Sequence, residues 1–211
     1  MTPAQPDHLE ALLAGFELAH ARPPAFPQAD VSYAVEDTAV GQILLACNDS
    51  GMLVASVFTP DQSAEEAMLT RLAARLSPRV LRRPEALDGA RRWLADYLAG
   101  RRRDTWPTWS LALASPFQAQ VLATLAERVP YGARATYGQL AGWAGHPSAA
   151  RAVGTALGAN PLCIVLPCHR IVGASGALTG YAGGLAAKRY LLDVEAARCT
   201  HVDVTSMPTF S

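Results

Sequence analysis

One short segment of the chain places a thiol directly before an imidazole. It reads Pro167-Cys168-His169-Arg170 and follows an apolar run, residues 162–166, that predicts a short buried strand. A cysteine becomes a nucleophile as its thiolate, and a nearby histidine or cation favours that form, while Pro167 restricts the local backbone. Because adjacent Cys-His pairs also arise by chance, the pair alone leaves open an incidental buried thiol.

The other three cysteines form no pattern of their own. Cys47 and Cys199 lie far from the rest, Cys163 lies five positions before Cys168, and no Cys-x-x-Cys or Cys/His group has zinc spacing. We therefore expect no metal site and no disulfide framework. Among the four cysteines, Cys168 is the one whose neighbours argue for chemistry.

A second segment indicates contact with another macromolecule. Residues 136–139 have the spacing of a capping box, Gly145 can end the helix that follows, and a further helix is expected over Ser148–Gly158, so the two suggest a helix-turn-helix. One face of the second helix is apolar, and the other is small and almost uncharged, with Ser148, Arg151, Ala152, Thr155 and Ala159. Such a face permits close approach to a partner. The alternative is a helix packed elsewhere within the protein.

The rest of the chain must position these segments. Three strands are expected over Ser32–Asp37, Gly41–Cys47 and Met52–Phe58, followed by helices over Ala64–Leu76 and Leu87–Leu98. A helix opens at Ser115-Pro116, and the second half is expected to be mainly helical until its last third. The fold class is therefore α+β, with a small N-terminal α/β domain and a mainly helical C-terminal domain that carries the helix-turn-helix and an active-site loop.

Domain boundaries follow from these elements. We expect an N-terminal extension over residues 1–30, the α/β domain with its connector over 31–110, the second domain over 111–197 and a tail over 198–211. Within the connector, Gly100–Asp104 is expected to be exposed, with its three arginines in solvent rather than on a partner.

Charge and hydropathy indicate where the chain could contact nucleic acid and whether it could contact a membrane. The 211 residues carry no net charge, but residues 1–114 hold 11 basic and 14 acidic side chains, whereas residues 115–211 hold 7 and 4. Contacts with phosphate are therefore expected in the second half. No apolar run approaches the length of about 20 residues that a membrane span needs, and the first residues lack the basic start of a secretory signal, so we expect a cytoplasmic protein without membrane contact.

From Phe117 to Glu195 the chain resembles the methylated-DNA–protein-cysteine methyltransferases. The resemblance rests on a series of motifs in matching order and spacing: Arg151-Ala152-Val153-Gly154, Asn160-Pro161, Pro167-Cys168-His169-Arg170, Gly180-Tyr181-Ala182-Gly183-Gly184-Leu185, Lys188 and Leu191-Leu192-Asp193-Val194-Glu195. The series is far more specific than a lone Cys-His pair. The N-terminal strands and helices are compatible with the family's less diagnostic first domain.

The resemblance implies direct repair of DNA without a cofactor. Cys168 would accept the alkyl group from O6 of guanine, His169 would be its water-mediated base, and Glu195 would orient the imidazole. Tyr137 would supply a hydroxyl at the edge of the departing purine, with packing at the start of its helix as the alternative. The thioether product does not readily hydrolyse, so one molecule would repair one base. O4-alkylthymine stays open as a second substrate.

The resemblance also implies how DNA is held. A monomer would bind alkylated double-stranded DNA through Ser148, Ala152 and Thr155, and the target base would be flipped out. Arg151 would replace it in the stack, with a phosphate contact as the alternative. Asn160 would tie the DNA-reading helix to the active-site loop, with a simple Asn-Pro turn as the alternative. The acceptor pocket and its support would include Pro167, Arg170, Tyr181 and Ala182.

Three other functions compete with transfer. The main alternative is a non-catalytic protein that binds alkylated DNA, but in the resemblance that class lacks a usable acceptor cysteine. A helix-turn-helix regulator is the second, although no additional regulatory module is evident in the sequence. The third is a cysteine hydrolase that uses Cys168 and His169, for which the motifs give no support.

Overall fold

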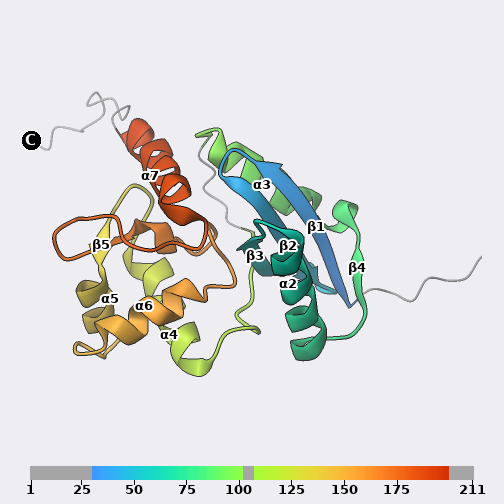
Figure 1. The fold of residues 1–211 in the computed structure, drawn as a ribbon, viewed down its shortest axis with the longest axis horizontal. Helices are drawn as coiled ribbons and strands as arrows, with labels where there is room; N and C mark the ends of the chain where they lie inside the picture. Colours follow the sequence, from blue (N-terminus) through green and yellow to red (C-terminus); the bar gives the residue numbers. More distant parts are fainter. Residues whose placement is uncertain (1–29, 102–106, 200–211) are drawn as a thin grey trace, which may run out of the picture.

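A four-stranded sheet organises the N-terminal half of the molecule (Figure 1). The computed structural model describes residues 30–101 and 107–199. Within them the sheet has the order β3-β2-β1-β4, formed by β1 (Val31–Thr38), β2 (Gly41–Asn48), β3 (Leu53–Phe58) and β4 (Val80–Arg82). β2 pairs antiparallel with both β1 and β3, and β4 joins β1 in parallel. The three expected strands are present, whereas β4 is too short to reveal itself by alternation.

Helices cover this sheet. On one side α2 (Gln62–Arg75) contributes Met68 and Leu72 to a core with Leu44 and Val54, and on the other α3 (Asp88–Leu98) joins a second, larger core. A 3₁₀ turn, Pro84–Leu87, precedes α3. The first helix begins at Gln62 rather than at the expected Ala64, because Asp61 accepts a hydrogen bond from the Ala64 amide at 2.9 Å and caps the helix there.

The C-terminal half contains three packed helices: α4 (Pro116–Arg128), α5 (Tyr137–Trp143) and α6 (Ala150–Gly158). They precede residues 160–170, which carry Cys168 and are called the acceptor segment below. Ser115 caps α4, and both hydrogen bonds of the capping box between Thr136 and Gln139 are formed, as expected. The expected start of α6 at Ser148 is wrong by two residues, because Ser148 lies in a turn after Pro147.

The last third of the second half is more helical than expected. It ends in α7 (Gly184–Cys199), a 16-residue helix. Its inner positions include the charged residues Lys188 and Glu195 as well as leucines, so apolar periodicity alone does not reveal it. The Lys188 Nζ donates to the carbonyls of Ile171, at 2.6 Å, and Thr179, at 2.9 Å, and thereby fastens α7 to the preceding loop.

The two halves share one hydrophobic core and one sheet edge. Buried residues of β2, α3 and α4 belong to the same cluster as Leu162–Leu166. The outer edge of β3 binds the connector, through the Leu53 amide and the Thr108 carbonyl at 2.8 Å, and also binds the acceptor segment, through the Ser56 amide and the Pro161 carbonyl at 2.8 Å. The N-terminal sheet therefore supports the segment that leads to Cys168.

Residues 162–166 do not form the expected strand. They make only isolated bridges, Ser56 with Leu162 and Cys163 with Leu166, because Ile164 adopts a left-handed backbone conformation with φ +72° that breaks an extended strand.

The α+β fold class is confirmed. Most of the Gly100–Asp104 connector lies outside the described residues, and among the described helices none has the length and apolarity to cross a membrane.

Candidate active site

Cys168 lies at the start of a 3₁₀ turn, η2 (Cys168–Arg170), deep in the C-terminal half. The turn leads into β6 (Ile171–Val172), which pairs in parallel with β5 (Ala135–Thr136) just before α5. The Cys168 side chain is buried. It is therefore held between the end of α6 and the start of α5, the two elements of the helix-turn-helix.

Asn160 joins α6 to the acceptor segment. Its Nδ2 donates to the Cys168 Sγ at 3.2 Å and to the Leu166 carbonyl at 3.0 Å, and its Oδ1 accepts from the Leu162 amide at 2.9 Å. Because these three bonds satisfy the buried amide group, Asn160 is fixed in one orientation with a donor directed at the sulfur. This is more than the simple Asn-Pro turn that the sequence also allowed.

The surroundings of Cys168 favour its thiolate. A hydrogen bond from the Cys163 side chain lowers the pKa of Cys168; burial acts in the opposite direction, and Asn160 and the charge of Lys188 lower the pKa further. The pKa of Cys163 itself is raised, first by its hydrogen bond with Cys168 and then by burial, so Cys163 stays a thiol. Contacts of this kind favour the thiolate, which is the nucleophilic form of a cysteine side chain.

His169, which follows Cys168 in the chain, forms a buried pair with Glu195. The His169 Nε2 lies 2.9 Å from the Glu195 Oε1, and the two side chains are 0% and 1% exposed. The other ring nitrogen, Nδ1, is buried without a hydrogen-bond partner among the described residues. Burial lowers the pKa of His169, so the imidazole is neutral near pH 7, and its Nδ1 is available as a proton acceptor.

Arg170 holds the carboxylate of Glu195 in its charged form. Its Nε donates to both carboxylate oxygens at 3.0 Å, and a terminal nitrogen donates to Oε1 at 2.8 Å. Burial tends to raise the pKa of Glu195, but the hydrogen bonds from His169 and Arg170 outweigh it and lower the pKa to about 2. The carboxylate is therefore anionic and accepts hydrogen bonds only.

Tyr97 belongs to this network and was not anticipated from the sequence. It comes from α3 of the N-terminal half, and its hydroxyl donates to the Glu195 Oε1 at 2.5 Å and lies 3.2 Å from the His169 Nε2. The only local signal was its inward position on α3, which is also what a core aromatic residue shows.

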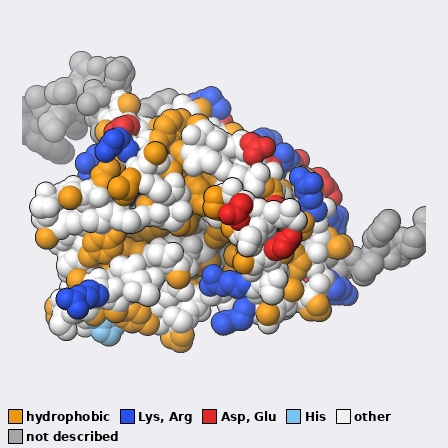
Figure 2. Space-filling view, in the orientation of Figure 1, with side chains coloured by type: hydrophobic (Ala, Val, Ile, Leu, Met, Phe, Trp, Pro, Cys, Tyr) orange, Lys and Arg blue, Asp and Glu red, His pale blue; other side chains and the backbone are white. Residues whose placement is uncertain are grey.

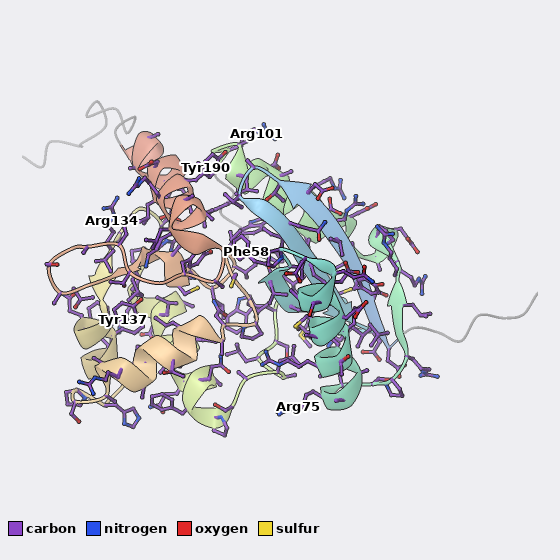
Figure 3. All side chains as sticks on the ribbon, in the orientation of Figure 1. Phe58, Arg75, Arg101, Arg134, Tyr137 and Tyr190 are labelled. Carbon is purple, nitrogen blue, oxygen red and sulfur yellow. The ribbon has the colours of Figure 1, made fainter. Side chains whose placement is uncertain are left out.

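Aromatic rings close the site on the side of the segment before α7. The Tyr181 ring lies edge-on to His169, with centroids 6.2 Å apart, and edge-on to Phe58, 5.5 Å apart. Its hydroxyl is buried without a hydrogen-bond partner among the described residues. Ala182 is exposed beside it. Phe58 lies between the two halves of the molecule (Figure 3), so a residue of the sheet contributes to this wall.

The outer face of α6 is free of other parts of the described structure. Arg151, Ala152 and Thr155 are exposed, and Ser148 is exposed in the preceding turn, whereas Val153 and Leu157 are buried. Packing of this face within the protein is thereby ruled out for the described residues. In Figure 2, hydrophobic side chains form a band across the C-terminal half with few charged side chains beside it.

Tyr137 begins α5 and points toward the loop before α7. Its hydroxyl accepts a hydrogen bond from the Thr179 Oγ1 at 3.1 Å, and its ring lies 3.6 Å from the position that a Cβ on Gly154 of α6 would occupy. The side chain is half-buried, so its hydroxyl lies at the edge of the site rather than in the core (Figure 3).

Among the described residues, no group of three or more His, Cys, Asp or Glu could hold a metal ion.

An α+β fold that holds a buried, activated cysteine behind a helix-turn-helix defines a class of DNA-acting proteins, and the comparisons place the chain within it. The family model of the 6-O-methylguanine DNA methyltransferase DNA-binding domain matches residues 116–197. A methylated-DNA–protein-cysteine methyltransferase of Methanosarcina acetivorans is 36% identical over 166 residues, which cover 77% of this chain and 97% of the relative. The chain belongs to the methylated-DNA–protein-cysteine methyltransferase family.

Other relatives match a smaller share. The methylated-DNA–protein-cysteine methyltransferase of Salmonella typhimurium is 50% identical over 99 residues, 47% of this chain and 57% of the relative, so the chain spans little more than half of that protein. The crystal structure of Mycobacterium tuberculosis OGT in complex with DNA is similar at 35% identity and a TM-score of 0.67, covering 79% of this chain and 94% of that one.

Proposed function

We propose that this protein repairs O6-alkylguanine in double-stranded DNA by transferring the alkyl group irreversibly to the Sγ of Cys168. The observation that carries this proposal is the buried sulfur of Cys168, which accepts a hydrogen bond from Asn160, together with the hydrogen bond between His169, the next residue in the chain, and Glu195. The helix that we propose to read DNA, α6, ends at Gly158, two residues before Asn160, so the nucleophile and the helix are coupled through the Asn160 side chain. The names of the relatives support the same activity.

The reaction is a substitution at the alkyl carbon. The thiol proton passes through a water molecule to the Nδ1 of His169, and the charge of Glu195 stabilises the imidazolium that forms. The thiolate attacks the alkyl carbon, a C–S bond forms, and the C–O bond to guanine breaks. The product is a thioether on Cys168, which has no route to hydrolysis here, so each molecule reacts once. The free Nδ1 and the anionic Glu195 support this assignment.

The leaving guanine gains its proton at the edge of the site. We assign this role to the Tyr137 hydroxyl, which stands at the start of α5 and accepts a hydrogen bond from Thr179. A phenol that already has a donor can release its own hydrogen to the departing purine without losing all its partners. Tyr181 and Ala182 border the alkyl pocket, Pro167 sets the backbone before Cys168, and Arg170 supports Glu195.

The buried thiol requires the target base to leave the duplex. Unstacking and unpairing cost a few kcal/mol, typically about 3. Arg151 compensates by entering the vacated stack, and the small side chains of Ser148, Ala152 and Thr155 allow α6 to approach a widened groove. Their exposure on one face supports this arrangement.

Mass spectrometry of the intact protein and its peptides tests the transfer. The protein is mixed with a duplex that contains one O6-methylguanine, and an undamaged duplex, Cys168→Ala and Cys47→Ala serve as controls. We expect one added methylene on Cys168, in the wild type and in Cys47→Ala only. Binding of the damaged duplex without any adduct would instead identify a protein that senses lesions and does not repair them.

A further inference from the structure

Tyr97 brings the N-terminal half into the chemistry of the site. It is a side chain of α3, 3% exposed, and its ring stacks on Trp93 and meets Tyr131 edge to face. Its hydroxyl nevertheless reaches the pair on the C-terminal side, 2.5 Å from the Glu195 Oε1 and 3.2 Å from the His169 Nε2. A residue needed only for packing would not require a hydroxyl at this position.

The hydrogens around Glu195 can be assigned one by one. Tyr97 has a single hydroxyl hydrogen, and because burial raises the pKa of Tyr97 it keeps that hydrogen at neutral pH. Glu195 is anionic and accepts only, so the hydrogen of Tyr97 points to its Oε1. The phenol oxygen is then an acceptor toward His169.

This assignment fixes the tautomer of the imidazole. The Nε2 of His169 faces two acceptor oxygens, Oε1 of Glu195 at 2.9 Å and the hydroxyl oxygen of Tyr97 at 3.2 Å. A nitrogen that faces two acceptors must carry the hydrogen. In the neutral ring Nδ1 is then without hydrogen, and Nδ1 is the atom that has no hydrogen-bond partner among the described residues.

We propose that Tyr97 is a positioning residue for the alkyl transfer: its hydroxyl shares the Glu195 carboxylate with His169, and so helps to hold the imidazole neutral, with its hydrogen on Nε2 and with Nδ1 ready to receive the thiol proton. This inference rests on the proposed function. It also gives the N-terminal half a role in the reaction, because the side chain that sets the tautomer is supplied by α3.

The other charged and titratable groups around the pair stay in place when the hydroxyl is removed. Arg170 binds Glu195 from η2, Lys188 of α7 and Arg170 both act electrostatically on His169, and Tyr181 packs against its ring. Tyr131 packs against Tyr97 itself. Tyr97→Phe therefore removes one donor to Glu195 and one acceptor for Nε2 while it keeps the aromatic packing.

The expected effect of Tyr97→Phe is on the pH profile of transfer. With one donor fewer, the carboxylate attracts the imidazole hydrogen more strongly, and the imidazolium, which cannot accept a proton, persists to higher pH. We expect the single-turnover rate on an O6-methylguanine duplex to fall about tenfold at pH 6.5, the effect of one hydrogen bond to a charged group. The difference should narrow toward pH 9, where the ring is neutral in both proteins.

Tyr190→Phe is the matched control. Tyr190 of α7 also joins the two halves, because its hydroxyl donates to the Leu98 carbonyl of α3 at 3.0 Å, one residue after Tyr97. It lies outside the site (Figure 3). The control should lose stability without any change in the pH profile. If Tyr97→Phe behaves in the same way as Tyr190→Phe, the role of Tyr97 is structural only and the proposal is overturned.

Nitrogen NMR of the ring provides a readout that does not depend on DNA. With ¹⁵N-histidine in both proteins, and the signals assigned by comparison with His169→Asn, we expect the neutral ring of His169 to carry its hydrogen on Nε2, and the doubly protonated ring to persist to higher pH in Tyr97→Phe than in the wild type. A hydrogen on Nδ1 in the wild type would overturn the proposal even if Tyr97→Phe failed to fold. A wild-type protein that shows the Nε2 tautomer but leaves O6-methylguanine intact would contradict the proposed function instead.

Discussion

The ring of Phe58 meets the ring of Tyr181 edge to face, at 5.5 Å between centroids and an interplanar angle of 75°. Phe58 ends strand β3, and Tyr181 belongs to the loop before α7, so the contact links the sheet to the wall of the acceptor site. It depends on Gly183, because a Cβ at that position would lie 2.6 Å from two atoms of the Phe58 ring. The close approach of loop and sheet therefore requires glycine.

Gly183→Ala should displace Phe58 and loosen this wall. We expect a loss of about 2 kcal/mol in the free energy of unfolding, as for other overpacked sites. Urea denaturation measures it. Gly180→Ala in the same loop is the control, since a Cβ there meets nothing within 4 Å. If the clash is the cause, Phe58→Leu should partly restore the stability of Gly183→Ala; equal losses for both glycines would argue against it.

Glu195→Gln should destabilise the fold by leaving Arg170 buried without its carboxylate partner. Breaking one side of a buried ion pair typically costs about 3–5 kcal/mol. Urea denaturation at pH 7 measures the loss, and Glu127→Gln, which changes an exposed carboxylate on α4, is the control. A loss no larger than that of the control would mean that the pair adds nothing to stability.

The same carboxylate predicts a dependence on pH. Because the pKa of Glu195 is lowered from 4.5 to about 2, its contribution is present above pH 4.5 and is lost as the pH falls toward 2. This amounts to about 3 kcal/mol by linkage. The lowered pKa of His169 acts in the same direction at higher pH. The stability difference between wild type and Glu195→Gln should shrink below pH 4.5, and a constant difference down to pH 2.5 would contradict it.

Cys163→Ala should slow the transfer by raising the pKa of Cys168, because the hydrogen bond from Cys163 is the largest cause of its lowered value. We expect a rate about tenfold lower at neutral pH, as for the loss of one hydrogen bond to a charged group. Single-turnover transfer against pH measures it. Cys163→Ser keeps a donor and should retain most of the rate, and Cys47→Ala should match the wild type. Equal rates for Cys163→Ala and Cys163→Ser would show that the donor does not matter.

Arg151→Ala should weaken both binding of the damaged duplex and base flipping by about tenfold, and Arg151→Lys separates the two roles of the side chain. Lysine replaces a phosphate contact but stacks poorly among bases. We therefore expect Arg151→Lys to bind well but to flip the base as poorly as Arg151→Ala, measured by 2-aminopurine fluorescence beside the lesion. Arg75→Ala, which removes an exposed arginine at the end of α2 in the N-terminal half (Figure 3), is the control. Full flipping by Arg151→Lys would favour the phosphate contact.

Local patterns in the sequence were sufficient for most of the scaffold. The strands β1 to β3, the capping box at Thr136 and the buried stripe of α6 depend on neighbours a few positions away, and these expectations are confirmed. The expected strand over 162–166 is wrong, because Ile164, packed in the core that both halves share, adopts a left-handed conformation. A local pattern does not report such packing.

In the candidate site, too, some features could be recognised from the sequence and others only from the structure. Cys168, His169 and Arg170 are adjacent in the chain, so their types and order could be recognised from the sequence, and the family motifs added Asn160 and Glu195. Two other features could not be recognised from the sequence: the contact between Cys163 and Cys168, and the packing of Phe58 against Tyr181 at the site. Each depends on how a loop folds against the sheet.

The sequence by itself determined the candidate nucleophile, the character of the α6 face and the family motifs, since all of these depend on residue types at short spacing. The tertiary structure decided which partners set the proton on His169. Tyr97 and Glu195 are 98 positions apart, and their hydrogen bond exists because α3 and α7 both contribute to the core that the two halves share. Hydrogen-bond direction depends on atoms in space rather than on order along the chain, so only the folded molecule reveals it.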